Sequence, residues 1–495
     1  MPRQAPPFFL GIDLGLSALK ACIIDAQGIV CAEAQAPLVS RHPQPGWCEQ
    51  SAPAWRSAMM RLTAQTWRKV AGKGSQLGGL SLTAGAHSAV LTDGRGRALA
   101  PAIMWNDQRA AAEADMLRRH EASFVRRALN RPSATWTAAH LLWRARHTPD
   151  ILRKAERLYW AKDWLRAQFT AQWHTDFSDA IGGLLADRRR QAWDAGLVAA
   201  ARWRMGNLPP IAAPLAQLGE ILPAAARASG LPSGAPVFLG ANDTSVELLT
   251  ANACAPGAVT IKLASAGVVS VCQAAARPKP PISLYPHLCA GLYYHASGTN
   301  ACTGALVWAQ RALGFASLAA LEHAAASSPP GANGVVFYPY LQGERAPLWT
   351  PHARAAWTGL THISTRADMA RAAWEGVTFA LAENWATMRR RLRIAETRAS
   401  LLGGGARSRF WGQMLADVTG LRLQVPRAAS AAYGAALVAA TASGCWRNLQ
   451  EAASANFRLA HELRPSSARH RLYRPLLRRF LAQRARLLEA QQQRR

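Results

Sequence analysis

The strongest constraint on the fold of this chain is a strand-turn-strand pattern near its start, FFLGIDLGLSALK, residues 8–20. A short apolar run ends at Asp13, Gly15 follows it, and a second apolar run covers residues 18–24. This order predicts a β-hairpin with a carboxylate at its rim. Because glycine exposes backbone N–H groups, such a turn suits a metal–phosphate ligand, although an ordinary β-turn shows the same pattern.

The same arrangement of strands recurs in the second half of the chain. A turn at residues 25–28 and an apolar run at 29–35 extend the first hairpin to a three-stranded antiparallel meander. The second half repeats it with a strand at 259–263, a small-residue turn at 264–267, and strands at 268–271 and 292–295. The repeat predicts a duplicated α/β domain with a cleft between the halves, although hairpins also recur in any α/β protein.

The size and cysteine content of the chain favour a reducing compartment. With 495 residues, half of them hydrophobic, it is long enough for two or three domains with cores of their own. We expect no membrane span, because no apolar run reaches ~18 residues, and no signal peptide, because the start lacks a long apolar segment. The eight cysteines are scattered without C-x-x-C spacing, which predicts neither a zinc site nor a disulfide framework and indicates a cytoplasmic protein.

The formal net charge of +29 raises the question of a nucleic-acid partner. The excess is mostly arginine spread along the whole chain, without a basic tract interleaved with aromatic residues, so compositional bias is the favoured interpretation and no specific nucleic acid is expected. The field should still attract anionic ligands such as nucleotides. Residues 471–490 form a basic amphipathic pattern, for which we favour a helix packed on its own domain over a membrane-surface role.

The strongest local signal for a ligand site lies in residues 401–420. A short apolar strand is followed by Gly403, Gly404 and Gly405, and Ser408 is placed to cap the helix that begins after it. Free backbone N–H groups at a loop where only glycine allows close approach suit a nucleotide. A flexible turn between strand and helix is the alternative.

One further carboxylate and one set of polar residues are candidates for catalysis and for sugar binding. Asp243 lies where a buried strand, residues 236–240, stops, so its carboxylate can take a proton from a substrate hydroxyl; the alternative is that it caps the helix beginning at Thr244. The other group lies at loops and strand ends of the first half and suits a sugar, since amides, carboxylates and aromatic faces bind hydroxyl-rich ligands. Its members are Trp47, Glu49, Gln50, His87, Asn106, Asp107 and Arg109.

Together these segments resemble the FGGY family of carbohydrate kinases and, within it, the xylulokinases. The resemblance runs in family order from about residue 8 to residue 440, and its last stretch is the most specific. The matching stretches are GIDLGLSALK, WCEQ, IMWNDQR, AKDWL, DFSDAIG, GANDT, FYPYLQGERAP, WTGLTH, WEGVTFALAENW and LLGGGARSRFWGQMLADVTG.

The resemblance implies two actin-like, RNase-H-type domains, residues 8–247 and 248–495, with a nucleotide and sugar cleft between them. It implies ATP-dependent phosphorylation of a primary hydroxyl, with D-xylulose giving D-xylulose 5-phosphate, in a cytoplasmic enzyme for which a homodimer is expected. Asp243 is then the general base, and Asp13 holds Mg²⁺ through water. The ATP and phosphate residues are Asp13, Gly15, Ser17, Ser265, Gly267, Gly403, Gly404, Gly405 and Ser408, and the sugar residues are His87, Trp105, Asn106, Asp107 and Asp243.

The chain departs from the family pattern at several positions. Leu16 replaces a threonine of the first phosphate turn, and the second turn reads ASAG, residues 264–267, instead of GTSG. The stretch GAHS, residues 85–88, replaces QMHG, and Thr244 replaces an asparagine. These changes leave open a kinase for another ketose or polyol, or a catalytically weakened protein that binds sugar or nucleotide.

Overall fold

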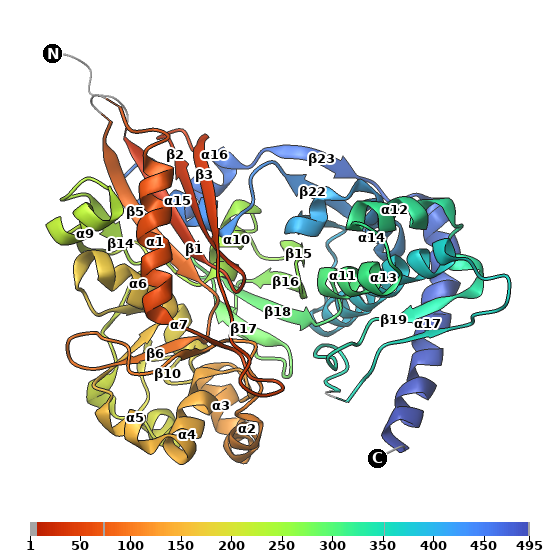
Figure 1. Cartoon of the computed structure of the whole chain (residues 1–495), viewed down its shortest axis with the longest axis horizontal. Helices are drawn as coiled ribbons and strands as arrows, with labels where there is room; N and C mark the ends of the chain where they lie inside the picture. The colour runs from red at the N-terminus through yellow and green to blue at the C-terminus, as the bar shows by residue number, and fades with distance from the viewer. Residues whose placement is uncertain (1–6, 73–74, 351, 494–495) are drawn as a thin grey trace. The chain divides into compact units, whose positions relative to one another are not determined.

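The chain forms two compact units in the computed structural model, which describes residues 7–72, 75–350 and 352–493 (Figure 1). The first unit comprises the described residues of Met1–Cys254 together with Ala275–Tyr293 and Ala428–Phe457, and the remainder forms the second unit. The first unit therefore continues past residue 247 to Cys254 and includes two later segments. The division into family domains at residues 247 and 248 stays a prediction.

A six-stranded sheet forms the centre of the first unit. Its strands, in sheet order, are β13 (Gln217–Glu220), β14 (Pro236–Phe238), β5 (Leu77–Ala84), β1 (Phe8–Leu14), β2 (Ala18–Ile24) and β3 (Val30–Pro37). The strands β1, β2 and β3 pair antiparallel, so the predicted opening meander is confirmed. The strands β5 and β14 run parallel to β1, which brings three carboxyl ends to one edge of the sheet.

Helices cover both faces of this sheet because the side chains of β1 alternate between two hydrophobic cores. Leu10 and Ile12 pack in the core that contains α1 (Ala52–Trp67) and α6 (Ala161–Thr170). Phe9 faces the other core, with α10 (Asp243–Thr250) and α15 (Ala431–Ala442). Gly11 lies so close to α15 that a Cβ atom would fall 1.9 Å from the Ala432 carbonyl oxygen, which only glycine permits.

Shorter elements complete the first unit. The helices are α2 (Ala111–Arg118), α3 (Glu121–Ala128), α4 (Thr137–His147), α5 (Pro149–Lys154), α7 (Phe177–Gly182), α8 (Ala195–Ala200), η1 (Met205–Asn207), α9 (Pro223–Ser229) and α16 (Leu449–Asn456). The strands are β4 (Glu49–Gln50), β6 (Ala89–Thr92), β7 (Ala102–Ile103), β8 (Arg157–Trp160), β9 (Thr175–Asp176), β10 (Ala186–Asp187), β11 (Ala192–Trp193), β12 (Ile211–Ala212) and β17 (Ser283–Pro286).

The sheet of the second unit repeats the plan of the first. It contains, in order, β18 (Tyr293–Thr299), β16 (Gly267–Gln273), β15 (Val259–Leu263), β21 (Arg398–Leu402), β22 (Arg422–Pro426) and β23 (Leu459–Leu463). The strands β15 and β16 form an antiparallel hairpin with β18 next to it, so the second predicted meander is also found. The strands β21 and β22 run parallel to β15, again behind a hairpin.

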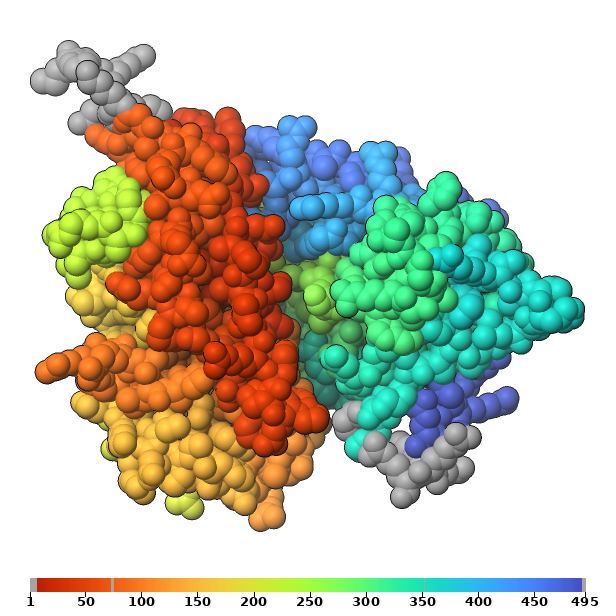
Figure 2. Space-filling model, in the orientation of Figure 1, coloured from red at the N-terminus to blue at the C-terminus, as the bar shows by residue number. Residues whose placement is uncertain are grey.

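A long helix, α13 (Arg366–Leu392), forms the core of the second unit and matches the helical pattern of its residues in the sequence. The remaining elements are α11 (Thr303–Ala312), α12 (Leu318–Ser327), η2 (Ala332–Gly334), β19 (Val336–Tyr338), β20 (Ala356–Thr358), η3 (Gly404–Arg407), α14 (Arg409–Thr419) and α17 (Ser467–Gln493). On the face drawn in Figure 2, the green to teal part of the chain, which includes α11 and α12, forms much of the surface of this unit.

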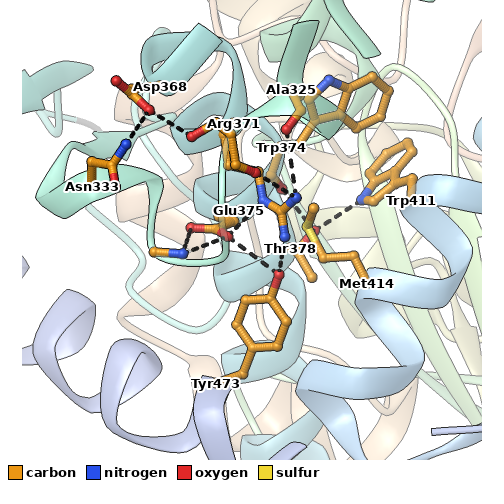
Figure 3. A network of polar contacts seen from close by, with 12 residues as sticks. Ala325, Asn333, Asp368, Arg371, Trp374, Glu375, Thr378, Trp411, Met414 and Tyr473 are labelled. Carbon is orange, nitrogen blue, oxygen red and sulfur yellow. Dashed lines mark hydrogen bonds and ion pairs between the residues drawn. The ribbon is translucent and has the colours of Figure 1, made fainter. Parts of the chain in front are cut away.

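The terminal helix α17 is fastened to α13 by buried polar contacts (Figure 3). Arg371 donates to the hydroxyl of Tyr473 at 2.6 Å, and that hydroxyl donates to Glu375 at 3.2 Å. Further along, the Arg484 guanidinium pairs with the Glu383 carboxylate. The interpretation of this segment as a helix packed on its own domain is therefore confirmed. Among the described residues, no helix combines the length and apolar character that a membrane crossing requires.

Candidate active site

In the first unit, three predicted site segments follow the carboxyl ends of three neighbouring parallel strands. Asp13 and Gly15 lie at the end of β1, His87 follows β5, and Asp243 follows β14. Ligands of open α/β sheets bind at such carboxyl edges, because the loops that leave the strands there converge. The topology therefore brings residues together that lie up to 230 positions apart in the sequence.

Asp13 lies at the rim of the first hairpin, as predicted, and its side chain is buried. It pairs in register with Thr83 of β5, whose hydroxyl donates to the Ala241 carbonyl at 2.6 Å, so this end of the sheet is tied to the segment that leads to Asp243. The N–H of Gly15 donates to the Ala18 carbonyl at 3.1 Å, so this group is used inside the turn and differs from the free N–H that the sequence suggested.

The two residues after Gly15 lie in different surroundings. Ser17 is exposed, which leaves its hydroxyl open to a ligand. Leu16 is partly buried and packs against the hydrophobic core on the α1 side of the sheet. Its carbonyl accepts a hydrogen bond from the Gln50 side chain at 2.6 Å. The family's threonine is thus replaced by a residue whose side chain serves the core.

Asp243 is the first residue of α10 and is half-buried. The alternative interpretation, that it caps this helix, is wrong, because Asn242 is the cap and accepts from the Ser245 N–H at 2.9 Å. One oxygen of Asp243 accepts from the Thr244 N–H at 2.7 Å. A carboxylate in the first turn of a helix interacts favourably with the helix dipole, so the position suits an acidic side chain.

His87 is held as a neutral ring with both nitrogens engaged. Its Nδ1 lies 2.8 Å from the Gly182 carbonyl oxygen, which can only accept, so Nδ1 carries the proton and Nε2 accepts from the Tyr285 hydroxyl at 3.1 Å. Burial lowers the pKa of His87 to about 4. The ring packs on Trp136, with centroids 4.3 Å apart. These contacts favour a wall of a binding site over an acid–base group.

Trp105 and Asn106 stand beside the segment of His87. The backbone N–H of Trp105 donates to the Ser88 hydroxyl at 3.1 Å. The Trp105 ring lies so close to Gly85 that a Cβ atom on Gly85 would fall 2.9 Å from the ring. Within the described part of the chain, the buried side-chain oxygen of Asn106 has no hydrogen-bond partner. An unsatisfied buried acceptor is costly unless a ligand supplies a donor, and a sugar hydroxyl is such a donor.

Asp107 is fully buried and is used by its neighbours. Its carboxylate pairs with the Arg109 guanidinium at 2.8 Å and accepts from the Cys48 N–H. Arg109 also pairs with Glu49 at 2.7 Å and lies over the ring of Trp47, 3.8 Å from its centroid. These contacts favour a role in holding the loop that carries Asn106, and direct sugar binding by Asp107 stays a prediction.

In the second unit, the two predicted nucleotide segments also follow neighbouring parallel strands. The turn at residues 264–267 leaves β15, and the glycine-rich loop leaves β21. The glycine-rich loop packs against the end of β15 at Gly403, which has φ of 85° and where a Cβ would fall 2.5 Å from the Leu263 carbonyl oxygen. Ser265 is exposed, whereas Gly267 is buried against Leu381.

The glycines of the loop differ in what they face. A Cβ at Gly405 would fall 2.4 Å from the ring of Trp411, whose indole N–H donates to the Thr378 hydroxyl at 3.0 Å (Figure 3). Packing alone therefore requires Gly403 and Gly405. Gly404 is exposed with open space at its Cα, so it is the position of the loop that a ligand can approach.

Ser408 caps α14 as predicted, because its hydroxyl oxygen accepts from the Trp411 N–H at 2.9 Å. The helix cap at Asn242 was missed, although an asparagine directly before a helical apolar pattern is a recognised start signal. The contacts of Gly182 and Tyr285 with His87 were missed as well. No local signal could have found these two, since they lie 95 and 198 residues from His87 in the sequence.

Comparisons with known proteins agree with this geometry. The family model for the N-terminal domain of the FGGY family of carbohydrate kinases matches residues 8–250, and the model for the C-terminal domain matches residues 273–443. The chain is 32% identical to a xylulose kinase of Klebsiella pneumoniae, over 84% of this chain and 85% of that protein. It is 30% identical to a xylulose kinase of Escherichia coli strain K12, over 94% and 96% of the two proteins.

A solved structure of the xylulose kinase from Rhodospirillum rubrum superposes with a TM-score of 0.86 at 29% identity, covering 98% of this chain and all of that chain. A ligand-bound xylulose kinase from Lactobacillus acidophilus has a TM-score of 0.90 at 21% identity, over 99% and 100% of the chains, and supports the fold. With both family domains matched in order, this chain belongs to the FGGY family of carbohydrate kinases and has its two-domain actin-like fold.

Proposed function

We propose that this protein transfers the γ-phosphoryl group of ATP to a primary hydroxyl of D-xylulose, giving D-xylulose 5-phosphate and ADP. The observation that carries the proposal is the placement of Asp243, a half-buried carboxylate at the start of α10, on the same sheet edge as Asp13 and His87. The similarity to xylulose kinases supports the choice of sugar. From the family resemblance we further expect a cytoplasmic homodimer.

In the proposed reaction, Asp243 accepts the proton of the sugar hydroxyl. The freed oxygen forms a bond to the γ-phosphorus, and the bond from that phosphorus to the bridging oxygen of ADP breaks. Asn106 accepts a hydrogen bond from another sugar hydroxyl, and the rings of Trp105 and His87 form walls of the sugar site. The turn at Ser265 and the open backbone at Gly404 contribute to holding the nucleotide.

Magnesium fits this arrangement through Asp13. Among the described residues, no group of three or more histidine, cysteine or acidic side chains is arranged to bind a metal by itself. Mg²⁺ commonly binds through one or two carboxylates together with water and substrate phosphates, and the buried carboxylate of Asp13 provides one. The ion would neutralise negative charge on the phosphates.

The test is a coupled ADP-release assay with pentuloses, hexuloses and polyols, followed by Asp243→Asn with the best substrate. We expect the highest kcat/KM with D-xylulose and a loss of at least about 10³-fold in kcat for the variant, since the asparagine cannot accept the proton. Turnover of Asp243→Asn near that of the wild type would remove Asp243 from the mechanism.

The same panel separates the proposal from its alternatives. A higher kcat/KM with another ketose or a polyol would correct the substrate and keep the kinase activity. Sugar binding by calorimetry without turnover of any substrate would instead identify a binding protein. The replaced residues of the two phosphate turns, Leu16 and residues 264–266, are the features that favour this second outcome.

A further inference from the structure

The short helix α7 connects two of the proposed site residues inside the first unit. At its start, the Ser178 hydroxyl accepts a hydrogen bond from the side-chain amide of Asn242 at 3.0 Å. At its end, the Gly182 carbonyl accepts from Nδ1 of His87 at 2.8 Å. Since Asn242 caps α10 and directly precedes Asp243, α7 contacts both the base segment and the sugar segment.

A buried cluster of charges fixes the start of α7. The Lys162 ammonium lies 2.7 Å from Asp163, 2.8 Å from Asp176 and 3.2 Å from Asp179. All four side chains are at most 3% exposed, so each carries a large desolvation cost that contacts with its charged neighbours help to offset. Such a cluster tolerates little displacement, because moving one member leaves a buried charge without its partner.

The charges of the cluster balance when one carboxyl is protonated. Lys162 and Arg166 are positive, and three aspartates face them. Burial raises the pKa of the Asp179 carboxyl well above its ordinary range.

A chain of hydrogen bonds links the cluster to Asn242, and in each bond the donor and the acceptor are determined. Asp176 caps α7 by accepting from the Ser178 N–H at 2.8 Å and also accepts the Ser178 hydroxyl proton. That hydroxyl can then only accept from Asn242, so the amide of Asn242 is oriented with its oxygen toward the Ser245 N–H, 2.9 Å away.

We propose that Ser178 is a positioning residue, which transmits the fixed geometry of the Lys162 cluster through Asn242 to the first turn of α10 and thereby places Asp243. The inference rests on the proposed role of Asp243 as general base. Ser178 itself touches neither substrate nor reacting atoms. A displacement of the base by about 1 Å is enough to lower a rate by about 100-fold.

Three variants test the inference. Ser178→Ala removes both hydrogen bonds of the hydroxyl, and Ser178→Thr keeps the hydroxyl and should rescue the effect. Thr66→Ala is the matched control, because Thr66 is also buried, donates to the Leu62 carbonyl at 2.7 Å and lies in α1 outside the chain of contacts. We expect kcat to fall about 10–100-fold in Ser178→Ala and to stay within about threefold of wild type in the other two.

The KM for ATP should not change in Ser178→Ala, since the chain of hydrogen bonds from the Lys162 cluster to α10 includes none of the predicted ATP and phosphate residues. An unchanged kcat in Ser178→Ala, or an equal fall in Thr66→Ala, would overturn the proposal. Should Ser178→Ala fail to fold, Asn242→Ser is the substitute. It keeps a hydroxyl to cap α10 but loses the amide that donates to Ser178, and it should lower kcat by a similar factor.

A second measurement separates this inference from the proposed function. Amide hydrogen exchange across α10, residues 243–250, reports the link whether or not the protein turns over a sugar. We expect at least about tenfold faster exchange there in Ser178→Ala and no change in Thr66→Ala. Unchanged exchange in Ser178→Ala rejects the link even in an active kinase. Faster exchange in a protein without kinase activity rejects the proposed function alone.

Discussion

At the scale of single residues, Leu16 shows how a substitution in a phosphate turn can be a packing choice. The side chain contacts the core of the first unit, so a threonine at this position would lose apolar contacts and bring a hydroxyl to a partly buried site. We expect Leu16→Thr to lower the free energy of unfolding by about 1–2 kcal/mol without improving kcat/KM for ATP. Urea unfolding and ATP titration measure the two effects.

The neighbouring Ser17 provides the matched comparison. Its exposed hydroxyl makes no contribution to the core, so Ser17→Ala should leave unfolding unchanged. If the hydroxyl donates a hydrogen bond to a phosphate, its loss weakens ATP binding by about 1.5–3 kcal/mol, which raises the KM for ATP roughly 10–100-fold. A tenfold gain of ATP affinity in Leu16→Thr would contradict the assignment of Leu16 to the core.

His140 is a residue whose neutral form the fold requires. It is buried, and neither ring nitrogen has a hydrogen-bond partner within the described part of the chain. Burial lowers its pKa to about 3, so the unfolded chain binds a proton below about pH 6.5 while the folded chain does not. By linkage, stability is therefore lost as the pH falls from 6.5 toward 3.

Replacing this residue should remove that loss. We expect His140→Leu to raise the free energy of unfolding by about 1 kcal/mol at pH 7, since it removes unsatisfied polar atoms, and by about 2 kcal/mol more at pH 5. Urea unfolding of both proteins at the two pH values measures the difference. A difference that is the same at pH 5 and pH 7 would show that His140 does not carry this pH dependence.

At the scale of elements, the glycine-rich loop after β21 separates packing from binding. Gly405→Ala places a methyl group against the ring of Trp411, so we expect a loss of stability of about 1–3 kcal/mol. Gly404→Ala points into open space and should leave the melting temperature within about 2 °C of wild type while raising the KM for ATP. Thermal unfolding and ATP titration of the pair measure both effects.

Unchanged stability of Gly405→Ala would contradict the packing role of Gly405. An unchanged KM for ATP in Gly404→Ala would contradict the binding role of Gly404. Two stable variants with identical ATP constants would mean that the nucleotide does not approach this loop.

The elements themselves were largely predictable. Local sequence patterns specify the hairpin of β1 and β2, the helix α13 and the cap at Ser408, because each depends on neighbours within a few residues. The engaged nitrogens of His87 and the bond from Asn242 to Ser178 were not predicted, since they depend on Tyr285 and α7, which approach only in the folded chain. Asp107 was expected at the sugar for its residue type, and only its contacts reveal that Arg109 occupies it.

At the scale of the whole molecule, the predicted repeat of the meander proved to be a repeat of two sheets. In each, a hairpin is followed by parallel strands whose carboxyl ends carry the predicted site segments. Because the two sheets follow the same plan, predicted site segments far apart in the sequence each lie at the carboxyl end of a parallel strand. Composition and periodicity alone do not reveal this shared position. The net charge of +29 is the other property that belongs to the entire chain.

This charge predicts how salt affects the two substrates. ATP is a polyanion and a pentulose is neutral, so the field of a strongly basic protein attracts only ATP, and salt screens that attraction over a Debye length of about 10 Å at 0.1 M. We expect the KM for ATP to rise several-fold between 50 and 300 mM NaCl, while the KM for the sugar changes less than about twofold. The sugar is the internal control, since an equal rise in both constants would indicate that salt acts on the fold. An ATP constant independent of salt would show that the arginines, although numerous, lie too evenly over the surface to direct the nucleotide to its site.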